Sequence, residues 1–372
     1  MDKIKKAIFF NIRMSICNFR CSYCYLAQRD EHYQGRQVEW SVKPAFFKKA
    51  FSRKRLGGQA YFNFCADGET LLVKDIDQYV KVLLEEGHYV EFITNASVTK
   101  VLDKFLAFDR ALLSHLEFKC SFHYLELKKK GLLEEFAENV KKIWDSGASA
   151  CIEITPTDDQ IPFLDEIKEF SVNNFGALPH LTIARNDNTK KIDYLTNLSM
   201  ADYDLIWSTF DSAFWRYKKS IFGKKQTGFC YAGQWSAYIN IETGDMNQCY
   251  CGKVIGNAYE SIDKPLPECP IGKCSLAHCY NGHAFLTLGL IPEILSANYG
   301  DIRDRTKKDG CHWLQREFKS FINTKLKDSN AELTDRDKKM ILRKSNVNSL
   351  FLIPRRIVSK IVHSFRKKKL SQ

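Results

Sequence analysis

The sequence contains no long hydrophobic run, no secretory signal and no low-complexity segment, and each absence excludes a class of protein. No apolar stretch reaches the roughly 18 residues that a membrane-spanning helix requires. The apolar segment nearest the N-terminus covers only residues 7–10, which is too short for the core of a signal peptide. Nine prolines and 19 glycines in 372 residues exclude a collagen-like or disordered chain, and a hydrophobic share of 44% predicts a globular protein with a full core.

Net charge is absent from the first 300 residues, so the formal charge of +12 comes entirely from the C-terminal region. Residues 301–372 contain 20 of the 56 lysines and arginines but only 8 of the 44 acidic residues. A basic segment on a neutral body favours an anionic partner for that segment and says little about the chemistry of the body.

The end of this basic region, residues 350–369, has an amphipathic pattern. Ile357, Ile361 and Phe365 share one face of a helix, with basic residues on the opposite face. Two interpretations stay open, a helix lying on the inner face of a membrane near anionic headgroups or a terminal helix packed on its own protein. We do not expect a nucleic-acid partner, because the aromatic residues lie on the apolar face and not among the basic ones.

Apolar strand patterns alternate with helical patterns through the first 185 residues, which predicts βα units and a parallel sheet. The expected strands are 4–12, 60–64, 89–94, 116–122, 150–154 and 180–184, and the clearest helices are 42–53, 80–86 and 132–144. The fold class that we expect is therefore α/β, a partial (β/α)6 TIM-like barrel with a small cysteine-rich α+β domain and a helical basic C-terminus.

Shifts in composition predict the domain organisation. The expected units are a partial barrel at 1–185, a helical connection at 186–229, a cysteine-rich domain at 230–296, a helical segment at 297–345 and a basic amphipathic tail at 346–372.

Thirteen cysteines in a chain without a secretory signal favour thiols and metal ligands over disulfides, because the cytosol keeps thiols reduced. We therefore expect a cytoplasmic protein, with the tail as its one possible contact with the membrane. Most of the cysteines fall in two clusters, which predicts two sites. Three isolated cysteines lie in apolar strand patterns and are expected in the core: Cys65, Cys120 and Cys151.

The first cluster has the spacing Cys17-x3-Cys21-x2-Cys24 and directly follows the first expected strand. Barrel active sites lie at that end of the strands. Three thiolates can hold three irons of a cubane cluster and leave the fourth iron open to another ligand. The alternative is a structural zinc site, which favours four closed ligands and Cys-x2-Cys pairs.

This spacing, with Tyr23 just before the third cysteine, resembles the signature of the radical S-adenosylmethionine (radical SAM) enzymes. The resemblance implies a 4Fe-4S cluster whose open iron binds S-adenosylmethionine. It also implies reductive cleavage to methionine and a 5'-deoxyadenosyl radical, which takes a hydrogen atom from a substrate. An electron donor such as flavodoxin or ferredoxin is implied as a partner.

Other strand ends carry further parts of the resemblance. Asp67-Gly68-Glu69 stands where the family usually has Gly-Gly-Glu, and Thr94-Asn95-Ala96 is similar to a common Thr-Asn-Gly. Polar residues at the later strand ends complete the rim. The resemblance implies cofactor contacts at Tyr23, Asp67, Gly68, Glu69, Asn95, Ser121, Glu153 and Arg185, with Ser121 and His123 as the candidate catalytic residues.

The second cluster opens with Cys230-x13-Gly244-x4-Cys249, which resembles the start of a SPASM domain, and Gly256-Asn257 also fits that module. A hairpin with a glycine turn is expected between the two cysteines. The later spacing departs from the family. One auxiliary 4Fe-4S cluster is implied, with ligands among Cys230, Cys249, Cys251, Cys269, Cys274 and Cys279. A zinc site that includes His278 is the alternative.

We therefore expect a radical SAM enzyme, an oxidoreductase or transferase, whose substrate the sequence does not identify. Relatives with this architecture modify peptides or proteins and sometimes sugars. The position of Cys17 leaves no room upstream for a leader-binding domain, which with the basic tail favours a membrane-associated glycan or lipid-linked intermediate. The alternatives are a peptide or protein maturase with a separate recognition partner and a non-catalytic metal-binding protein.

Overall fold

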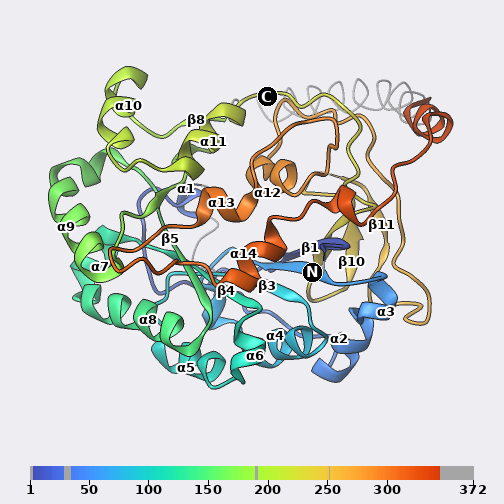
Figure 1. The fold of residues 1–372 in the computed structure, drawn as a ribbon, viewed down its shortest axis with the longest axis horizontal. Helices are drawn as coiled ribbons and strands as arrows, with labels where there is room; N and C mark the ends of the chain where they lie inside the picture. Colours follow the sequence, from blue (N-terminus) through green and yellow to red (C-terminus); the bar gives the residue numbers. More distant parts are fainter. Residues whose placement is uncertain (1–2, 29–34, 189–191, 251, 344–372) are drawn as a thin grey trace, which may run out of the picture.

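One nine-stranded sheet organises the computed structural model, which describes residues 3–28, 35–188, 192–250 and 252–343 (Figure 1). The strand order is β11-β10-β9-β1-β2-β3-β4-β5-β6, and β1 to β6 are parallel. The predicted partial (β/α)6 barrel is confirmed. The strands are β1 Lys6–Asn11, β2 Ala60–Phe64, β3 Tyr89–Thr94, β4 Leu116–Ser121, β5 Ser149–Ile154, β6 His180–Leu181, β7 Arg185–Asn186, β8 Asp193–Tyr194, β9 Ser236–Asn240, β10 Asp245–Asn247 and β11 Val254–Asn257.

Helices connect the strands and cover both faces of the sheet. The helices are α1 Tyr25–Gln28, α2 Pro44–Ala50, α3 Arg53–Leu56, α4 Ile76–Glu85, α5 Thr99–Leu106, α6 Arg110–Leu113, α7 Tyr124–Lys130, α8 Leu133–Ser146, α9 Leu164–Phe175, α10 Met200–Ser208, α11 Ala213–Ile221, α12 Gly282–Thr287, α13 Tyr299–Arg303 and α14 Arg316–Ile322, with short 3-10 turns at Thr70–Leu72, Asp158–Phe163 and Leu326–Asp328. Residues 335–343 are also helical.

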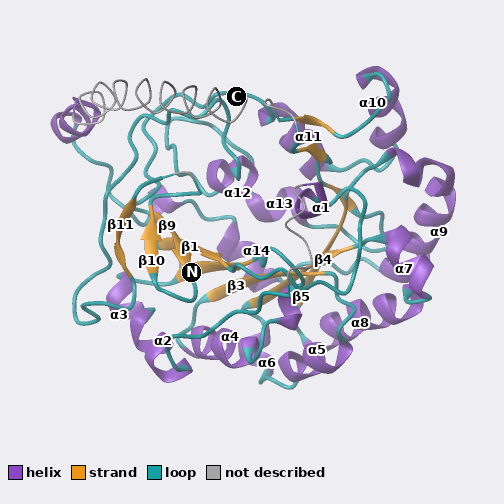
Figure 2. Cartoon of the chain, turned by 180° about the vertical axis from the view of Figure 1, so that it is seen from behind, coloured by secondary structure: helices purple, strands orange, loops and turns teal. Residues whose placement is uncertain are grey.

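The two faces of the barrel strands pack into two different cores, because successive side chains of a strand point to opposite faces. Phe62, Val90 and Phe118 belong to the outer core, on the side of α2, α4, α5 and α8. Phe9 and Tyr89 belong to the inner core together with residues of the later helices. Figure 2 shows α12 and α13 on the side of the sheet opposite α4, α5 and α6.

A buried ion cluster closes the inner face near the middle of the strands. Arg303 of α13 is fully buried and donates to Glu91 of β3 at 2.5 Å and to Glu117 of β4 at 2.8 Å. Tyr299 donates to the same Glu91 at 3.1 Å, and Asn63 of β2 donates to it at 2.6 Å. The C-terminal helices therefore fill the interior that the six strands leave open.

The expected hairpin continues the barrel sheet. β9 pairs with β1 in parallel, from Ala7 beside Ser236 to Asn11 beside Asn240, and β10 then turns back along β9. Gly244 makes the turn at φ +79°, and a Cβ there would lie 2.5 Å from Asn257 Oδ1, so only glycine fits. The second cysteine segment is thus attached to the first strand of the barrel.

Two sequence predictions fall outside the described residues or remain untested. The tail at 346–372, including the amphipathic segment 350–369, lies outside the described residues. The domain limits that we derived from composition stay predictions. In the described ranges, no helix has the length and apolar character needed to cross a bilayer.

Candidate functional site

The first cysteine loop lies where β1 to β4 end, at the edge of the sheet that we call the carboxyl edge. Cys21 is buried, whereas Cys17 and Cys24 keep partial exposure. The loop is fixed by its backbone: the amide of Cys24 donates to the carbonyl of Cys21, and the amide of Arg20 donates to Glu126 of α7 at 3.0 Å. The three thiols therefore lie near one another on a loop that is fixed by its backbone.

Burial and mutual proximity make these thiols difficult to ionise without a cation. Burial raises the pKa of Cys17 to about 11, and the nearby Glu69 and Cys24 add to it. Burial and the other two thiols raise the pKa of Cys21 to about 12. A positively charged iron cluster would reverse this by stabilising the thiolates, so the donor set fits such a group.

The loop does not have the geometry of a single-ion site. Within the described residues, no three His, Cys, Asp or Glu side chains converge on one point where a metal ion could sit. A cubane binds each cysteine to a different iron, so its ligands need not converge in that way. The donor set therefore allows a cubane cluster, with one iron for each thiol.

Gly68 docks the loop after β2 against the cysteine loop. A Cβ on Gly68 would lie 2.1 Å from the carbonyl oxygen of Ile16, so no larger residue fits. The flanking amides of Asp67 and Glu69 donate to the carbonyls of Ile12 and Ile16 at 3.0 and 2.9 Å. Asp67 itself is exposed at the carboxyl edge, beside Cys24. This contact explains the one glycine kept in Asp67-Gly68-Glu69.

Glu69 ties the ends of β2 and β3 together. Its buried carboxylate accepts hydrogen bonds from the Thr94 hydroxyl at 2.5 Å, the Asn95 amide at 2.8 Å and the Leu71 amide at 2.9 Å. Burial raises the pKa of Glu69, and these donors oppose the rise. Its observed contacts are those of a residue that positions the two loops.

Asn95 links the third strand end to the cysteine loop. Its side-chain amide donates to Asn18 at 2.8 Å, and Ser97 donates to its oxygen at 2.6 Å. The next residue, Ala96, has φ +52°, a left-handed conformation that favours glycine. The left-handed backbone at this position explains why the related Thr-Asn-Gly pattern has a glycine there.

The fourth strand end carries the two candidate catalytic residues. The Tyr23 hydroxyl lies 2.6 Å from His123 Nδ1, which joins the cysteine loop to the end of β4. Burial lowers the pKa of His123 to about 4, so its imidazole is neutral at pH 7. Ser121, the last residue of β4, is partly exposed at the same edge.

Glu153 and Arg185 lie on the inner side of the carboxyl edge. Glu153 of β5 forms an ion pair with Lys119 of β4 at 2.8 Å and is almost fully buried. Arg185 lies over the ring of Tyr25 in α1 at 5.6 Å, and its carbonyl accepts from Gln28 at 3.0 Å. The structure therefore brings Arg185 beside the cysteine loop, whereas Glu153 is engaged deeper in the barrel.

Four cysteines of the second segment lie close enough to influence one another. Burial raises the pKa of Cys230 to about 12, and Cys279, Cys249 and Cys274 raise it further. The backbone of Cys230 pairs with Gly272, which fixes it against the segment that carries Cys274. Three described cysteines of the second segment thus lie near Cys230.

Cys269 lies at the side of that group. Its amide donates to the carbonyl of Gly233 at 2.7 Å, and Gln248 donates to its carbonyl at 2.7 Å. A Cβ on Gly233 would lie 2.3 Å from the Cys269 oxygen, so this glycine permits the close approach. Cys251 lies outside the described residues. The Nε2 atom of His278 is buried and has no hydrogen-bond partner among the described residues.

The prediction that Cys65 belongs to the core is wrong. Cys65 is exposed: it directly follows β2 and alternates with Tyr61 and Asn63 on the inner face, at the carboxyl edge. The Cys65 thiol lies close enough to raise the pKa of Tyr25, beside the first cluster, and of Tyr250, beside the second. Cys120 and Cys151 are fully buried, as expected.

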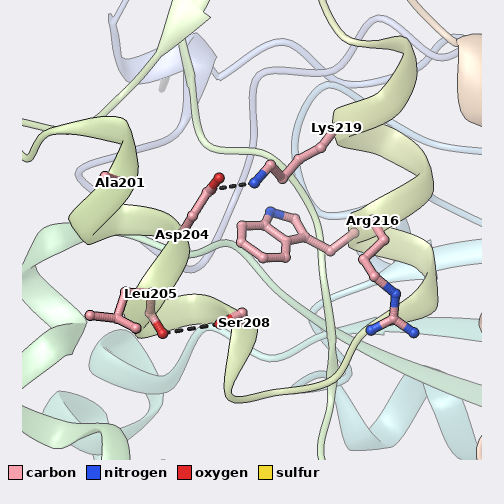
Figure 3. A pocket seen from close by; sticks show the side chains of 7 residues that line it. Ala201, Asp204, Leu205, Ser208, Arg216 and Lys219 are labelled. Carbon is pink, nitrogen blue, oxygen red and sulfur yellow. Dashed lines mark hydrogen bonds and ion pairs between the residues drawn. The ribbon is translucent and has the colours of Figure 1, made fainter.

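A separate groove of about 530 Å³ lies between α10 and α11 (Figure 3). Lys219 and Asp204 form an ion pair across it, and Lys219 also lies 4.4 Å from the Trp215 ring centroid. The groove contains none of the cysteines or rim residues predicted from the sequence.

Several groups near the site were missed by sequence reasoning. Lys119 could have been found, because it alternates with Ser121 on the inner face of β4. Lys218 and Arg303 reach the interior from helices that are distant in sequence, and no local pattern signals this.

A family model described as the Radical SAM superfamily matches residues 11–176. The match runs from the last residue of β1 to the end of α9 and includes the first cysteine loop. No curated protein sequence matches the chain.

Solved structures with a similar arrangement are distant. Streptococcus suis SuiB is 14% identical over 70% of this chain and 65% of its own, with a TM-score of 0.47, so the chain spans less than two thirds of SuiB. The anSMEcpe structure with AdoMet and Cp18Cys peptide is 15% identical over 94% and 99% of the two chains, with a TM-score of 0.47. BtrN in complex with AdoMet and 2-DOIA is 16% identical over 71% and 82%, with a TM-score of 0.38. At such distances these similarities carry no inference about the reaction.

Proposed function

Since this chain is an enzyme of the radical SAM superfamily, we propose that Cys17, Cys21 and Cys24 hold its 4Fe-4S cluster at the carboxyl edge. When bound, the reduced cluster supplies the electron that cleaves S-adenosylmethionine into methionine and a 5'-deoxyadenosyl radical, which takes a hydrogen atom from the substrate. The single observation that carries the proposal is the fixed cysteine loop, whose three thiols lie near one another, with Asp67 close to Cys24.

The other rim residues have two kinds of role in this proposal. Asp67, Ser121 and Arg185 are exposed or half-buried at the carboxyl edge, where they can contact S-adenosylmethionine. Gly68, Glu69 and Asn95 position the loops through buried contacts. Tyr23 and His123 couple the cysteine loop to β4, and this contact supports a role for His123 beside the bound nucleoside.

We also propose one auxiliary 4Fe-4S cluster in a SPASM-like segment, held by Cys230, Cys249, Cys274 and Cys279. Its support is the proximity of Cys249, Cys274 and Cys279 to Cys230 and the hairpin that fixes Cys230 and Cys249 relative to β1. Cys269 is held by Gly233 and Gln248 and serves as the alternative ligand.

The test compares the wild type with Cys17→Ala/Cys21→Ala/Cys24→Ala after anaerobic cluster reconstitution. Iron and sulfide are counted, and 5'-deoxyadenosine is measured after addition of dithionite and S-adenosylmethionine. We expect the triple variant to lose about four irons and all 5'-deoxyadenosine, since each cysteine of the loop ligates one iron.

Two controls keep this test decisive. Cys120→Ala removes a buried thiol from the outer core and should retain the full iron content. Zinc in place of iron, or a triple variant that still forms 5'-deoxyadenosine, would contradict the proposal.

A further inference from the structure

Three basic side chains surround one aromatic ring on the inner side of the barrel. The ammonium groups of Lys119 in β4 and Lys218 in α11 lie 5.2 and 4.9 Å from the ring centroid of Phe214. The ring of His283 in α12 meets the same phenyl ring edge-on at 5.4 Å. Three elements from distant parts of the chain thus bring two ammonium groups and one imidazole together. Burial and the nearby cations lower the pKa of His283 well below its usual value, so its imidazole is neutral and offers an N–H.

The nearby carboxylates already have partners. Glu91 and Glu117 bind Arg303, and Glu153 pairs with Lys119 at 2.8 Å. Burial opposes the charge of Lys119, but Glu153 overcomes this and raises its pKa.

Lys218 has no ion-pair partner among the described residues, although Glu153 lies near enough to act on its charge. Its ammonium donates to the hydroxyl of Thr182, and no carboxylate of the described residues lies within ion-pair distance of it. Burial and the charge of Lys119 lower the pKa of Lys218 to about 7, and Glu153 offsets only part of this effect. An anion placed between the two ammonium groups would remove this repulsion.

The site is accessible and close to the carboxyl edge. Lys218 is half-buried, and 12% of the Lys119 side-chain surface is exposed. Lys119 precedes Ser121 by two residues on the same face of β4, and Arg185 adds positive charge near Lys218. Two ammonium groups and a hydroxyl, arriving from different elements, match a dianion with several oxygens better than a single carboxylate.

We propose that Lys119, Lys218 and His283 bind a phosphate group of the substrate, so that the substrate is a phosphorylated molecule. This inference rests on the proposed function, because it assumes that the substrate enters at the carboxyl edge. The same cations could instead receive the carboxylate of S-adenosylmethionine, and the test separates these two sources.

The test measures binding of inorganic pyrophosphate to the reconstituted full-length protein by anaerobic calorimetry. Lys218→Met keeps the length of the side chain against Phe214 but removes its charge. We expect about tenfold weaker pyrophosphate binding, as for loss of a charge-assisted hydrogen bond, and partial recovery in Lys218→Arg. The matched control is Lys219→Met, since Lys219 lies on the outer side of α11, paired with Asp204, and should bind pyrophosphate like the wild type.

Affinity for S-adenosylmethionine is measured on the same samples. If Lys218→Met weakens S-adenosylmethionine binding about tenfold and the wild type does not bind pyrophosphate, the cations serve the cofactor and the proposal is wrong. Equal pyrophosphate binding by all variants would place the anion elsewhere and also overturn it. Failure of the radical chemistry would show separately, as absence of 5'-deoxyadenosine in a wild type that still binds pyrophosphate.

Discussion

The first cysteine loop lies at the ends of four parallel strands, whereas the second cysteine segment is attached to the sheet through one hairpin at its side. The first loop is held by backbone amides of Asp67 and Glu69 in the loop after β2. The Asn95 side chain also donates to Asn18, and the Glu126 carboxylate accepts the Arg20 amide. In the second segment, residues 258–281 contain no helix or strand, and Cys269 and Cys274 are held mainly by turns and close glycine contacts.

This difference indicates what each region needs in order to keep its shape. The barrel presets the first loop, because its hydrogen bonds join elements that are already packed into the outer core. The second segment buries few apolar side chains between 258 and 281, so its ligands should depend on the bound cluster for their order.

The largest expected effects come from substituting the glycine that permits close backbone contact in each region. In Gly68→Ala, the new Cβ would meet the Ile16 carbonyl at 2.1 Å and displace the cysteine loop. We expect a loss of 5'-deoxyadenosine formation of about a hundredfold, since displacements of about 1 Å have such effects on reacting groups. Product analysis and iron counting of the reconstituted variant measure it.

Gly233→Ala is the matched change in the second segment, because its Cβ would lie 2.3 Å from the Cys269 oxygen. This variant should lose auxiliary iron and keep cleavage of S-adenosylmethionine. If both variants lose the same iron and the same activity, the two regions are not independent.

Removal of iron should increase amide exchange in the two cysteine regions to different extents. After anaerobic chelation, amide exchange in residues 249–281 should accelerate on the order of tenfold more than in residues 11–24, because a loop without packed elements opens locally at low free energy. Hydrogen-exchange mass spectrometry with and without iron measures the difference. Equal acceleration in both regions would show that the barrel does not preset the first loop.

The scaffold of the first loop should also weaken in acid through His88. This buried imidazole donates from Nε2 to the Phe51 carbonyl at 2.8 Å and accepts the Ala60 amide at Nδ1, so protonation removes an acceptor that β2 needs. Burial lowers its pKa from 6.5 to about 4. The unfolded chain therefore binds the proton first, and stability present above pH 6.5 is lost as the pH falls toward 4.

The free energy of unfolding should fall through this range by up to about 3 kcal/mol from His88 alone. Denaturant unfolding at a series of pH values measures the slope. The free energy of unfolding should change less with pH in His88→Gln. An unchanged pH dependence would show that His88 does not cause the loss of stability.

The smallest expected effect concerns two left-handed positions, one in each region. Ala96, at φ +52°, should gain about 0.5 kcal/mol of stability as Ala96→Gly, because relief of backbone strain exceeds the added entropy of the unfolded chain. Gly244, at φ +79°, should lose stability as Gly244→Ala. Thermal unfolding checks both signs, and destabilisation by Ala96→Gly would contradict the strain at this position.

The sequence was informative where a local pattern determines the structure. The predicted strands 60–64 and 89–94 match β2 and β3, because short apolar runs between helices have few other solutions. The cysteine spacing likewise located the first loop. Cys65 was misplaced, because an apolar strand pattern does not tell which inward position is exposed at the carboxyl edge. Lys218 and Arg303 could not be placed, since Arg303 meets Glu117 across 186 residues of sequence.

The bond from Arg303 to Glu91 and Glu117 has a consequence for the order of folding during synthesis. The six strands leave the ribosome first, but their interior then contains two carboxylates without the guanidinium that binds them. Buried charges without a partner are costly, so the barrel cannot reach its final packing until α13 has been translated. The nascent strands should therefore remain an open intermediate that chaperones can bind. A chain that stops before residue 303 should not form a stable barrel.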